Sequence, residues 1–192
     1  MPLPRNRKSR GIDCHHVHQC CRLFLFSVQH TSLHRIPDKI HSLRCLVRRV
    51  SRASVRVDQK VIGKIANGLL VYLGVETGDE EDDLIWLLKK LVGMRIFEDS
   101  QGKMNETLGS EDGIMLISQF TLFGNMKKGS RPSFNRAAEP VVARKLFEDF
   151  LRLLRLEFKG TLAVGAFGEH MDIEAVDDGP VSIWIDSRLK SY

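Results

Sequence analysis

Residues 68–75, with the sequence GLLVYLGV, form a continuous apolar run of the length of one β-strand. A short apolar run bounded by glycine is typical of a strand that is buried on both faces. The acidic residues 80–83 follow it, where negative charge in the first turn of a helix is favoured by the helix dipole. Cap candidates lie at 77–79, and beyond them four leucines stand at helical spacing: Leu84, Leu87, Leu88 and Leu91. The stretch therefore predicts a buried strand that leads directly into an amphipathic helix.

The segment before this run has the character of β-structure. Residues 44–50 and 53–57 are rich in β-branched side chains and predict two strands. A polar turn at 58–60 then leads into residues 61–65, which predict the second arm of a hairpin.

The segment after it alternates between strands and one further helix. We expect a short strand at 94–97, a longer strand at 113–123, and a polar loop at 124–136. Pro140 is placed to open a helix whose apolar stripe is formed by Ala143, Leu146, Phe147, Phe150, Leu151 and Leu154. Three more strands are expected at about 161–165, 171–176 and 181–186, the last two joined by a turn at Asp178-Gly179. This order predicts one α/β domain with a mixed sheet over residues 43–192.

The formal charge of +5 belongs to the N-terminal extension, residues 1–42. That segment holds seven Lys or Arg against two Asp, whereas basic and acidic residues balance in the rest of the chain. Contact of the domain with nucleic acid would therefore depend on a local basic patch. No stretch reaches the roughly 18–20 apolar residues that span a membrane, and a single domain cysteine, Cys45, fits a reducing, cytoplasmic environment.

Residues 1–42 lack helical or strand periodicity and hold six of the seven histidines. We interpret them as a dispensable, disordered extension. One alternative is a metal site in the Cys/His-rich run 14–21, although its spacing matches no structural zinc module. Another is a mitochondrial targeting segment, since the stretch is rich in arginine and poor in acids.

Standard catalytic sets are missing from the sequence of the domain. Residues 43–192 contain no G-x-S-x-G, P-loop, H-E-x-x-H or C-x-x-C pattern, and their one histidine, His170, suits a structural role better than that of a general base. Two segments are unusual. Residues 118–122 place Ser118, Gln119 and Thr121 at the end of an apolar strand, and residues 178–182 read DGPVS. Taken alone, propensity explains the first as a strand running into solvent and the second as a hairpin turn.

Together these segments resemble the two signature motifs of the D-aminoacyl-tRNA deacylase family. Residues 118–122 match its S-Q-F-T-L motif in full, and residues 177–182 resemble its N-x-G-P-V-T motif with Asp177 for Asn and Ser182 for Thr. The similarity continues through 49–55, 95–99, 128–134 and the segment containing Phe167, Gly168 and Met171. It covers essentially all of residues 43–192.

The resemblance implies a three-layer α/β/β domain that acts as a homodimer on D-aminoacyl-tRNA and glycyl-tRNA, without cofactor or metal. It assigns catalysis to Ser118, Gln119, Phe120 and Thr121, with the Phe120 N–H stabilising an oxyanion and the substrate's 2′-hydroxyl assisting. A Gly179–Pro180 pair with a cis bond, inserted from the other subunit, would read the α-ammonium group. Arg49 would hold that pair, and the pocket would be completed by Phe134, Phe167 and Met171.

The basic loop supplies Lys127, Lys128 and Arg131 as expected tRNA phosphate contacts. Ser182 keeps the hydroxyl of the family residue, whereas Asp177 replaces an amide with a carboxylate. Two rival hypotheses remain: a tRNA- or RNA-binding module without turnover, and a relaxed deacylase that also attacks some L-aminoacyl-tRNA.

Overall fold

The structure is a computed structural model, and it describes residues 42–189. The Cys/His-rich run and the proposed targeting segment lie outside the described residues. Within the described part, the mixed α/β architecture expected from the sequence is confirmed. None of the helices in residues 42–189 is long and apolar enough to cross a membrane.

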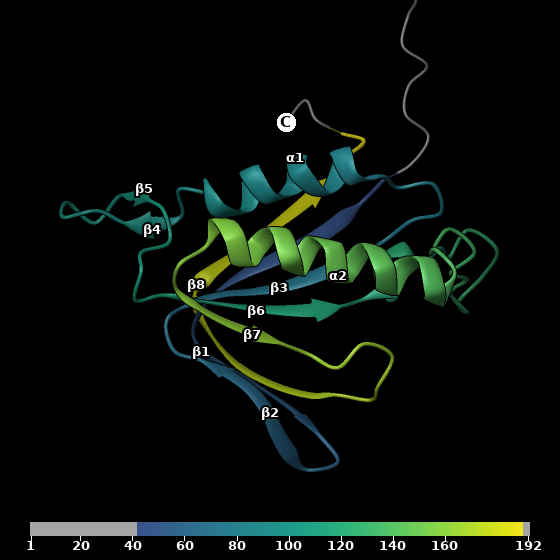
Figure 1. The fold of residues 1–192 in the computed structure, drawn as a ribbon, viewed down its shortest axis with the longest axis horizontal. Helices are drawn as coiled ribbons and strands as arrows, with labels where there is room; N and C mark the ends of the chain where they lie inside the picture. Colours follow the sequence, from purple (N-terminus) through teal and green to yellow (C-terminus); the bar gives the residue numbers. More distant parts are fainter. Residues whose placement is uncertain (1–41, 190–192) are drawn as a thin grey trace, which may run out of the picture. The chain divides into compact units, whose positions relative to one another are not determined.

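A six-stranded mixed sheet forms the centre of the domain (Figure 1). Its strand order is β2-β1-β3-β6-β7, and β8 also pairs with β1. Pairing is antiparallel between β1 and each of β2, β3 and β8, and parallel from β3 to β6 and from β6 to β7. The strands are β1 (Arg44–Val57), β2 (Lys60–Ile65), β3 (Gly68–Gly74), β6 (Gly113–Ser118), β7 (Thr161–Val164) and β8 (Asp172–Asp186).

The first strand is longer than the sequence predicted. Residues 44–50 and 53–57 belong to one 14-residue strand, so the prediction of two strands was wrong. The polar residues between them stay extended because β8 pairs along both halves of β1, with Arg52 opposite Val176. The hairpin to β2 is confirmed, and Asp58 and Gln59 at its turn both have positive φ, as a type I′ turn requires.

Two helices, α1 (Glu81–Val92) and α2 (Pro140–Glu157), lie on the same side of the sheet (Figure 1). Pro140 opens α2 as predicted. The cap of α1 is Glu80 rather than a residue in 77–79, and the Glu80 N–H donates to Asp83 Oδ2 over 3.1 Å.

Alternating residues of the central strands face two separate hydrophobic cores. Leu69, Val71 and Leu73 pack with the buried leucines of α1 and with α2, whereas Leu70 packs in the other core with residues of β1, β2, β6 and β7. Burial of a leucine side chain contributes roughly 1.5–3 kcal/mol to stability. The apolar run that predicted a strand buried on both faces is thus confirmed.

Strand β6 ends at Ser118, so the prediction of a strand from 113 to 123 was wrong. Gln119 N–H still donates to the Leu73 carbonyl oxygen over 2.8 Å, and the chain then turns into the 3₁₀ helix η1 (Phe120–Phe123). The predicted strand at 94–97 is reduced to β4 (Phe97–Glu98), which pairs with β5 (Met104–Glu106), a strand that the sequence did not predict.

The expected hairpin at Asp178-Gly179 was also wrong. Strand β8 runs through this position, because both of its halves pair with the same strand, β1. Asp177 lies opposite Val50 and Ser182 opposite Arg48, so residues 178–181 face Arg49 alone. The Gly-Pro segment is therefore a large bulge within one strand.

Candidate active site

A cavity of about 260 Å³ opens where β6 passes into η1. Its polar lining includes Ser118 and Gln119, and its apolar walls come from β3, α2 and the loop after β7. Five of the candidate catalytic and substrate-binding residues line it together: Ser118, Gln119, Phe120, Phe167 and Met171.

Phe120 is the first residue of η1 and projects from the cavity wall. Its side chain is 57% exposed and packs edge-on against Phe134, with ring centroids 5.1 Å apart. At the first position of a helix, a backbone N–H has no partner within the helix. Phe120 therefore lines the cavity with a largely exposed ring, and its backbone N–H has no partner within η1.

Thr121 lies one residue further along η1 and is exposed. Its Oγ1 accepts a hydrogen bond from Gln119 Nε2. Thr121 does not belong to the cavity lining, whereas Gln119 does. A hydrogen bond therefore joins the two side chains at the edge of the cavity, and of the two only Gln119 lines it.

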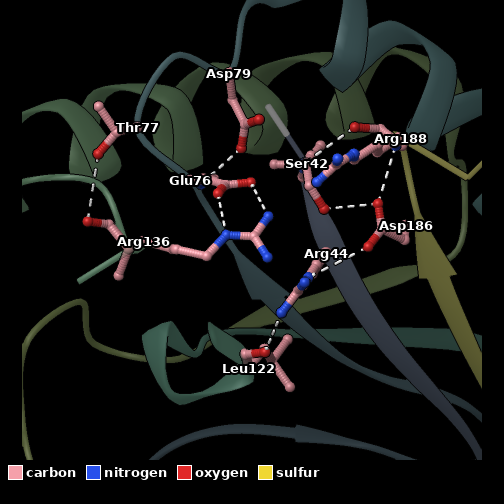
Figure 2. Close-up of polar contacts among 12 residues, drawn as sticks. Ser42, Arg44, Glu76, Thr77, Asp79, Leu122, Arg136, Asp186 and Arg188 are labelled. Carbon is pink, nitrogen blue, oxygen red and sulfur yellow. Dashed lines mark hydrogen bonds and ion pairs between the residues drawn. The ribbon is translucent and has the colours of Figure 1, made fainter. Parts of the chain in front are cut away.

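Arg44 of β1 anchors η1 to the sheet (Figure 2). Its Nη1 donates to the Leu122 carbonyl oxygen over 2.9 Å, and its Nε donates to Asp186 Oδ2 over 3.3 Å. The guanidinium also lies 4.8 Å from the ring centre of Phe123. One side chain therefore connects the first strand, the last strand and the segment that carries the site motif.

The basic loop is held at its C-terminal end by a second ion pair, shown in Figure 2. Arg136 donates to both carboxylate oxygens of Glu76, over 2.5 and 2.8 Å. This pairing raises the pKa of Arg136 above its usual value. Glu76 is only 6% exposed, so this arginine supplies the partner that a buried carboxylate needs.

A second cavity, also about 260 Å³, lies within the basic loop. It brings together the three expected phosphate contacts, Lys127, Lys128 and Arg131. The sequence reasoning missed the residues that complete its lining, namely Phe123, Asn125, Ser133, Asn135 and Arg136. The position of four of them in the polar loop 124–136 was the available signal. The Asn125–Ser133 bridge, which folds the loop back on itself, could not be read from the sequence.

The Gly-Pro bulge lies on the β1–β8 ladder and is not part of either cavity lining. The Gly179–Pro180 peptide bond is cis, as the resemblance implied. Arg49 is 5% exposed and holds the bulge: its Nε lies 3.1 Å from the Asp178 carbonyl oxygen and 2.9 Å from Asp178 Oδ2. Its Nη1 donates to the Ile96 carbonyl oxygen over 2.5 Å, which ties the bulge to the segment after α1.

The cavity beside Phe120 also contains residues that the sequence reasoning had placed elsewhere. Ala143 and Phe147 were assigned to the core stripe of α2, and His170 to a structural role, yet all three line the cavity. Helical periodicity identifies the inward face of a helix but does not separate core from cavity wall. Arg144 secures the opposite wall, because its Nη2 donates to the Phe167 carbonyl oxygen over 3.2 Å and its guanidinium lies 4.7 Å from the Phe167 ring centre.

The cysteine found among residues 42–189 lies away from the cavity beside Phe120. Cys45 is fully buried, and burial raises the pKa of its thiol. No group of three or more His, Cys, Asp or Glu residues in that range is placed to hold a metal ion.

Fold and site together define a mixed α/β protein with a largely apolar cavity at the end of β6, where Ser118, Gln119 and Phe120 form part of its lining. A family model described as D-Tyr-tRNA(Tyr) deacylase matches residues 46–186. The chain belongs to this family.

Curated relatives are similar over nearly their whole length. A D-aminoacyl-tRNA deacylase of Natranaerobius thermophilus is 46% identical over 149 residues, which is 77% of this chain and 99% of the relative. One from Kosmotoga olearia is 47% identical over 147 residues, 76% of this chain and 98% of the relative.

Solved structures share the fold. A structure described as c-Myc DNA Unwinding Element Binding Protein is 33% identical with a TM-score of 0.69, covering 74% of this chain and 97% of that one. A probable eukaryotic D-amino acid tRNA deacylase has a TM-score of 0.66 at 16% identity, covering 76% of this chain and 99% of that one. The second likeness shows the fold alone.

Proposed function

We propose that this chain is a D-aminoacyl-tRNA deacylase, a hydrolase that cleaves the ester between a D-amino acid and the terminal ribose of tRNA. The observation that carries the proposal is the turn at Ser118, where Ser118, Gln119 and Phe120 of the S-Q-F-T-L segment line a cavity and Phe120 opens η1. Family membership and relatives of 46–47% identity support the same activity.

The proposed reaction needs no protein nucleophile. A water oxygen bonds to the ester carbonyl carbon, and the bond from that carbon to the ribose oxygen breaks. The proton that the water loses passes to the ribose oxygen with assistance from the neighbouring 2′-hydroxyl. The Phe120 N–H stabilises the oxyanion that forms on the way. Thr121, held by Gln119, orients the scissile ester, and Ser118 contributes a hydroxyl to the cavity.

Chirality is read by the Gly-Pro bulge in this proposal. The carbonyl oxygens of Gly179 and Pro180 bind the α-ammonium group and leave no space for the side chain of an L-amino acid. Glycine has no side chain to exclude, so glycyl-tRNA is a substrate as well. Phe134, Phe167 and Met171 shape the pocket, while Lys127, Lys128 and Arg131 contact tRNA phosphates.

The complete site requires a homodimer of three-layer α/β/β subunits in this proposal. Gly179 and Pro180 do not line the cavity beside Phe120 of their own chain, so a second copy has to supply them. Exposed apolar side chains along β8 suit such a contact, namely Val176, Ile183 and Trp184. The dimer acts in the cytoplasm on charged tRNA, and residues 1–42 leave mitochondrial targeting as an alternative.

The decisive experiment compares D-tyrosyl-tRNA and L-tyrosyl-tRNA as substrates of the purified chain. Rapid release of D-tyrosine with an intact L-substrate is expected, together with the mass of a dimer in sedimentation. Release of tyrosine from both substrates would instead identify a relaxed deacylase.

A second candidate function is nucleic-acid binding without turnover. It is favoured by the likeness to a structure described as a DNA-unwinding-element binding protein and by the basic cavity of the loop. Tight binding of uncharged tRNA together with no release of D-tyrosine would select this candidate.

A further inference from the structure

Two adjacent carboxylates lie where the Gly-Pro bulge begins: Asp177 is the last paired residue before it and Asp178 is its first residue. Two adjacent arginines of β1 face them. Arg49 forms an ion pair with Asp178. Arg48 forms a bidentate ion pair with Asp177, in which Nε donates to Oδ1 over 3.0 Å and Nη2 donates to Oδ2 over 2.7 Å. Neighbouring residues of a strand point to opposite faces of the sheet. The two arginines therefore hold the start of the bulge from opposite faces of the sheet.

The Arg48–Asp177 pair spans the base of the bulge. Arg48 lies opposite Ser182, the first paired residue after the bulge, while Asp177 is the last paired residue before it. The ion pair thus joins the two points at which residues 178–181 leave and rejoin the ladder. Two parallel hydrogen bonds fix the orientation of the two side chains as well as the distance between them, whereas a single hydrogen bond fixes only the distance.

We propose that Arg48 and Asp177 are a matched pair of positioning residues for the Gly-Pro bulge, and that Arg48 accommodates the carboxylate that replaces the amide of the family motif at 177. This inference rests on the proposed function of the bulge in reading the α-ammonium group. The hydrogen bonds that Arg48 donates to Asp177 also raise the pKa of Arg48.

The two members of the pair have different consequences when removed. Without Arg48, the Asp177 carboxylate has no cation beside it at the base of the bulge, and its negative charge displaces the segment. Without the charge of Asp177, Arg48 still finds an amide oxygen at the same place. When both residues are replaced by amides, the two side chains can again form a hydrogen bond across the base of the bulge, now without charge.

The test is a cycle of Arg48→Gln, Asp177→Asn and the double variant, assayed on D-tyrosyl-tRNA. The expected fall in kcat/KM is about tenfold, mainly in kcat, for Arg48→Gln and about threefold for Asp177→Asn, because small misplacement of a reading group is costly. The double variant is expected within about twofold of wild type. Melting temperatures should stay within about 3 °C, because both side chains are partly exposed and such pairs add little stability.

Arg56 and Glu174 provide the matched control. They form an ion pair of 2.9 Å between the same two strands, away from the bulge. Arg56→Gln and Glu174→Gln are expected to leave kcat/KM within about twofold of wild type. An equal loss in the control pair, losses that multiply in the double variant, or an Arg48→Gln variant as active as wild type would overturn the inference.

Hydrogen exchange separates this inference from the proposed function. Amide exchange of a peptide covering residues 176–184 should be faster in Arg48→Gln than in Arg56→Gln and should return to wild type in the double variant. This readout needs no turnover. An inactive wild-type chain would defeat the deacylase proposal, while equal exchange in Arg48→Gln and Arg56→Gln would defeat the positioning role.

Discussion

Arg44 Nη1 donates a hydrogen bond to the Leu122 carbonyl oxygen over 2.9 Å, although the two residues are 78 positions apart in the sequence. Leu122 lies in η1, the short helix that presents Phe120 and Thr121. The same guanidinium is paired with Asp186 at the end of β8. A contact from a strand 78 positions earlier in the sequence therefore holds the proposed catalytic segment.

Replacing Arg44 should affect catalysis more than folding alone explains. Arg44→Gln leaves the Leu122 carbonyl and the buried Asp186 without this donor, at a cost of about 1–3 kcal/mol in the free energy of unfolding. We expect kcat to fall roughly tenfold as η1 shifts. Arg44→Lys keeps the charge but lacks the planar fork, so it should not restore kcat. Denaturant melts and single-turnover assays measure both effects, with the exposed Arg52→Gln as control. A variant that is less stable but has an unchanged kcat would show that Arg44 stabilises the fold without positioning η1 for catalysis.

Gly179→Ala tests the reading of chirality by backbone. Gly179 has a φ of +137°, and a Cβ there would lie 2.6 Å from the Val181 nitrogen. The bulge must change shape, so we expect kcat/KM for D-tyrosyl-tRNA to fall by more than about a hundredfold. Gly102→Ala is the control, since Gly102 also has positive φ but open space around its Cβ position. Wild-type turnover by Gly179→Ala would refute the mechanism even if the chain is a deacylase.

Thr121→Ala should have a smaller effect. It removes one hydroxyl that accepts a hydrogen bond from Gln119, so we expect a loss of about 0.5–1.5 kcal/mol in transition-state stabilisation. Steady-state kinetics on D-tyrosyl-tRNA and L-tyrosyl-tRNA provide the measurement, and no preference for the L-substrate should appear. A thousandfold loss would mean that Thr121 takes part in the chemistry itself.

Cys45 should be chemically inert in the folded protein. Because burial raises the pKa of its thiol, almost no thiolate exists at pH 8, whereas an unfolded chain with a cysteine pKa near ~8.5 has a reactive fraction. In a chain carrying Cys14→Ser, Cys20→Ser and Cys21→Ser, a disulfide reagent should label Cys45 only after denaturation. Cys45→Ala should retain activity within about threefold and lose roughly 1 kcal/mol of stability. Rapid labelling of the native protein would contradict the burial.

The N-terminal boundary can be tested with two truncations. A chain that begins at Ser42 should fold and hydrolyse D-tyrosyl-tRNA as the full chain does. A chain that begins at Leu43 lacks the Ser42 Oγ donor, which lies 2.6 Å from the buried Asp186. We expect it to remain active but to melt roughly 3 °C lower, as the loss of one hydrogen bond in a domain of this size predicts. An inactive or monomeric first truncation would show that the preceding residues are required.

The amino-acid sequence by itself determined the parts of this protein that depend on neighbouring residues. Apolar periodicity predicted β3 and the inward faces of α1 and α2, and the turn at Asp58 was marked by its residue types. The two short motifs marked the segments that contain Phe120 and Gly179. Each of these features is encoded within a few positions, so local reasoning reaches it.

Tertiary structure alone decided how these segments are shaped and paired. Asp178-Gly179 has the signature of a hairpin, yet the pairing of β1 with both halves of β8 keeps the strand continuous and turns the segment into a bulge. Arg48 pairs with Asp177 and Arg49 pairs with Asp178 because of the register of β1 and β8, although the partners are 129 positions apart in the sequence. A chain with many arginines and acids allows many such pairs. Only the alignment of strands brings two of them within hydrogen-bonding distance, because side chains of adjacent strands meet only where the register places them opposite each other.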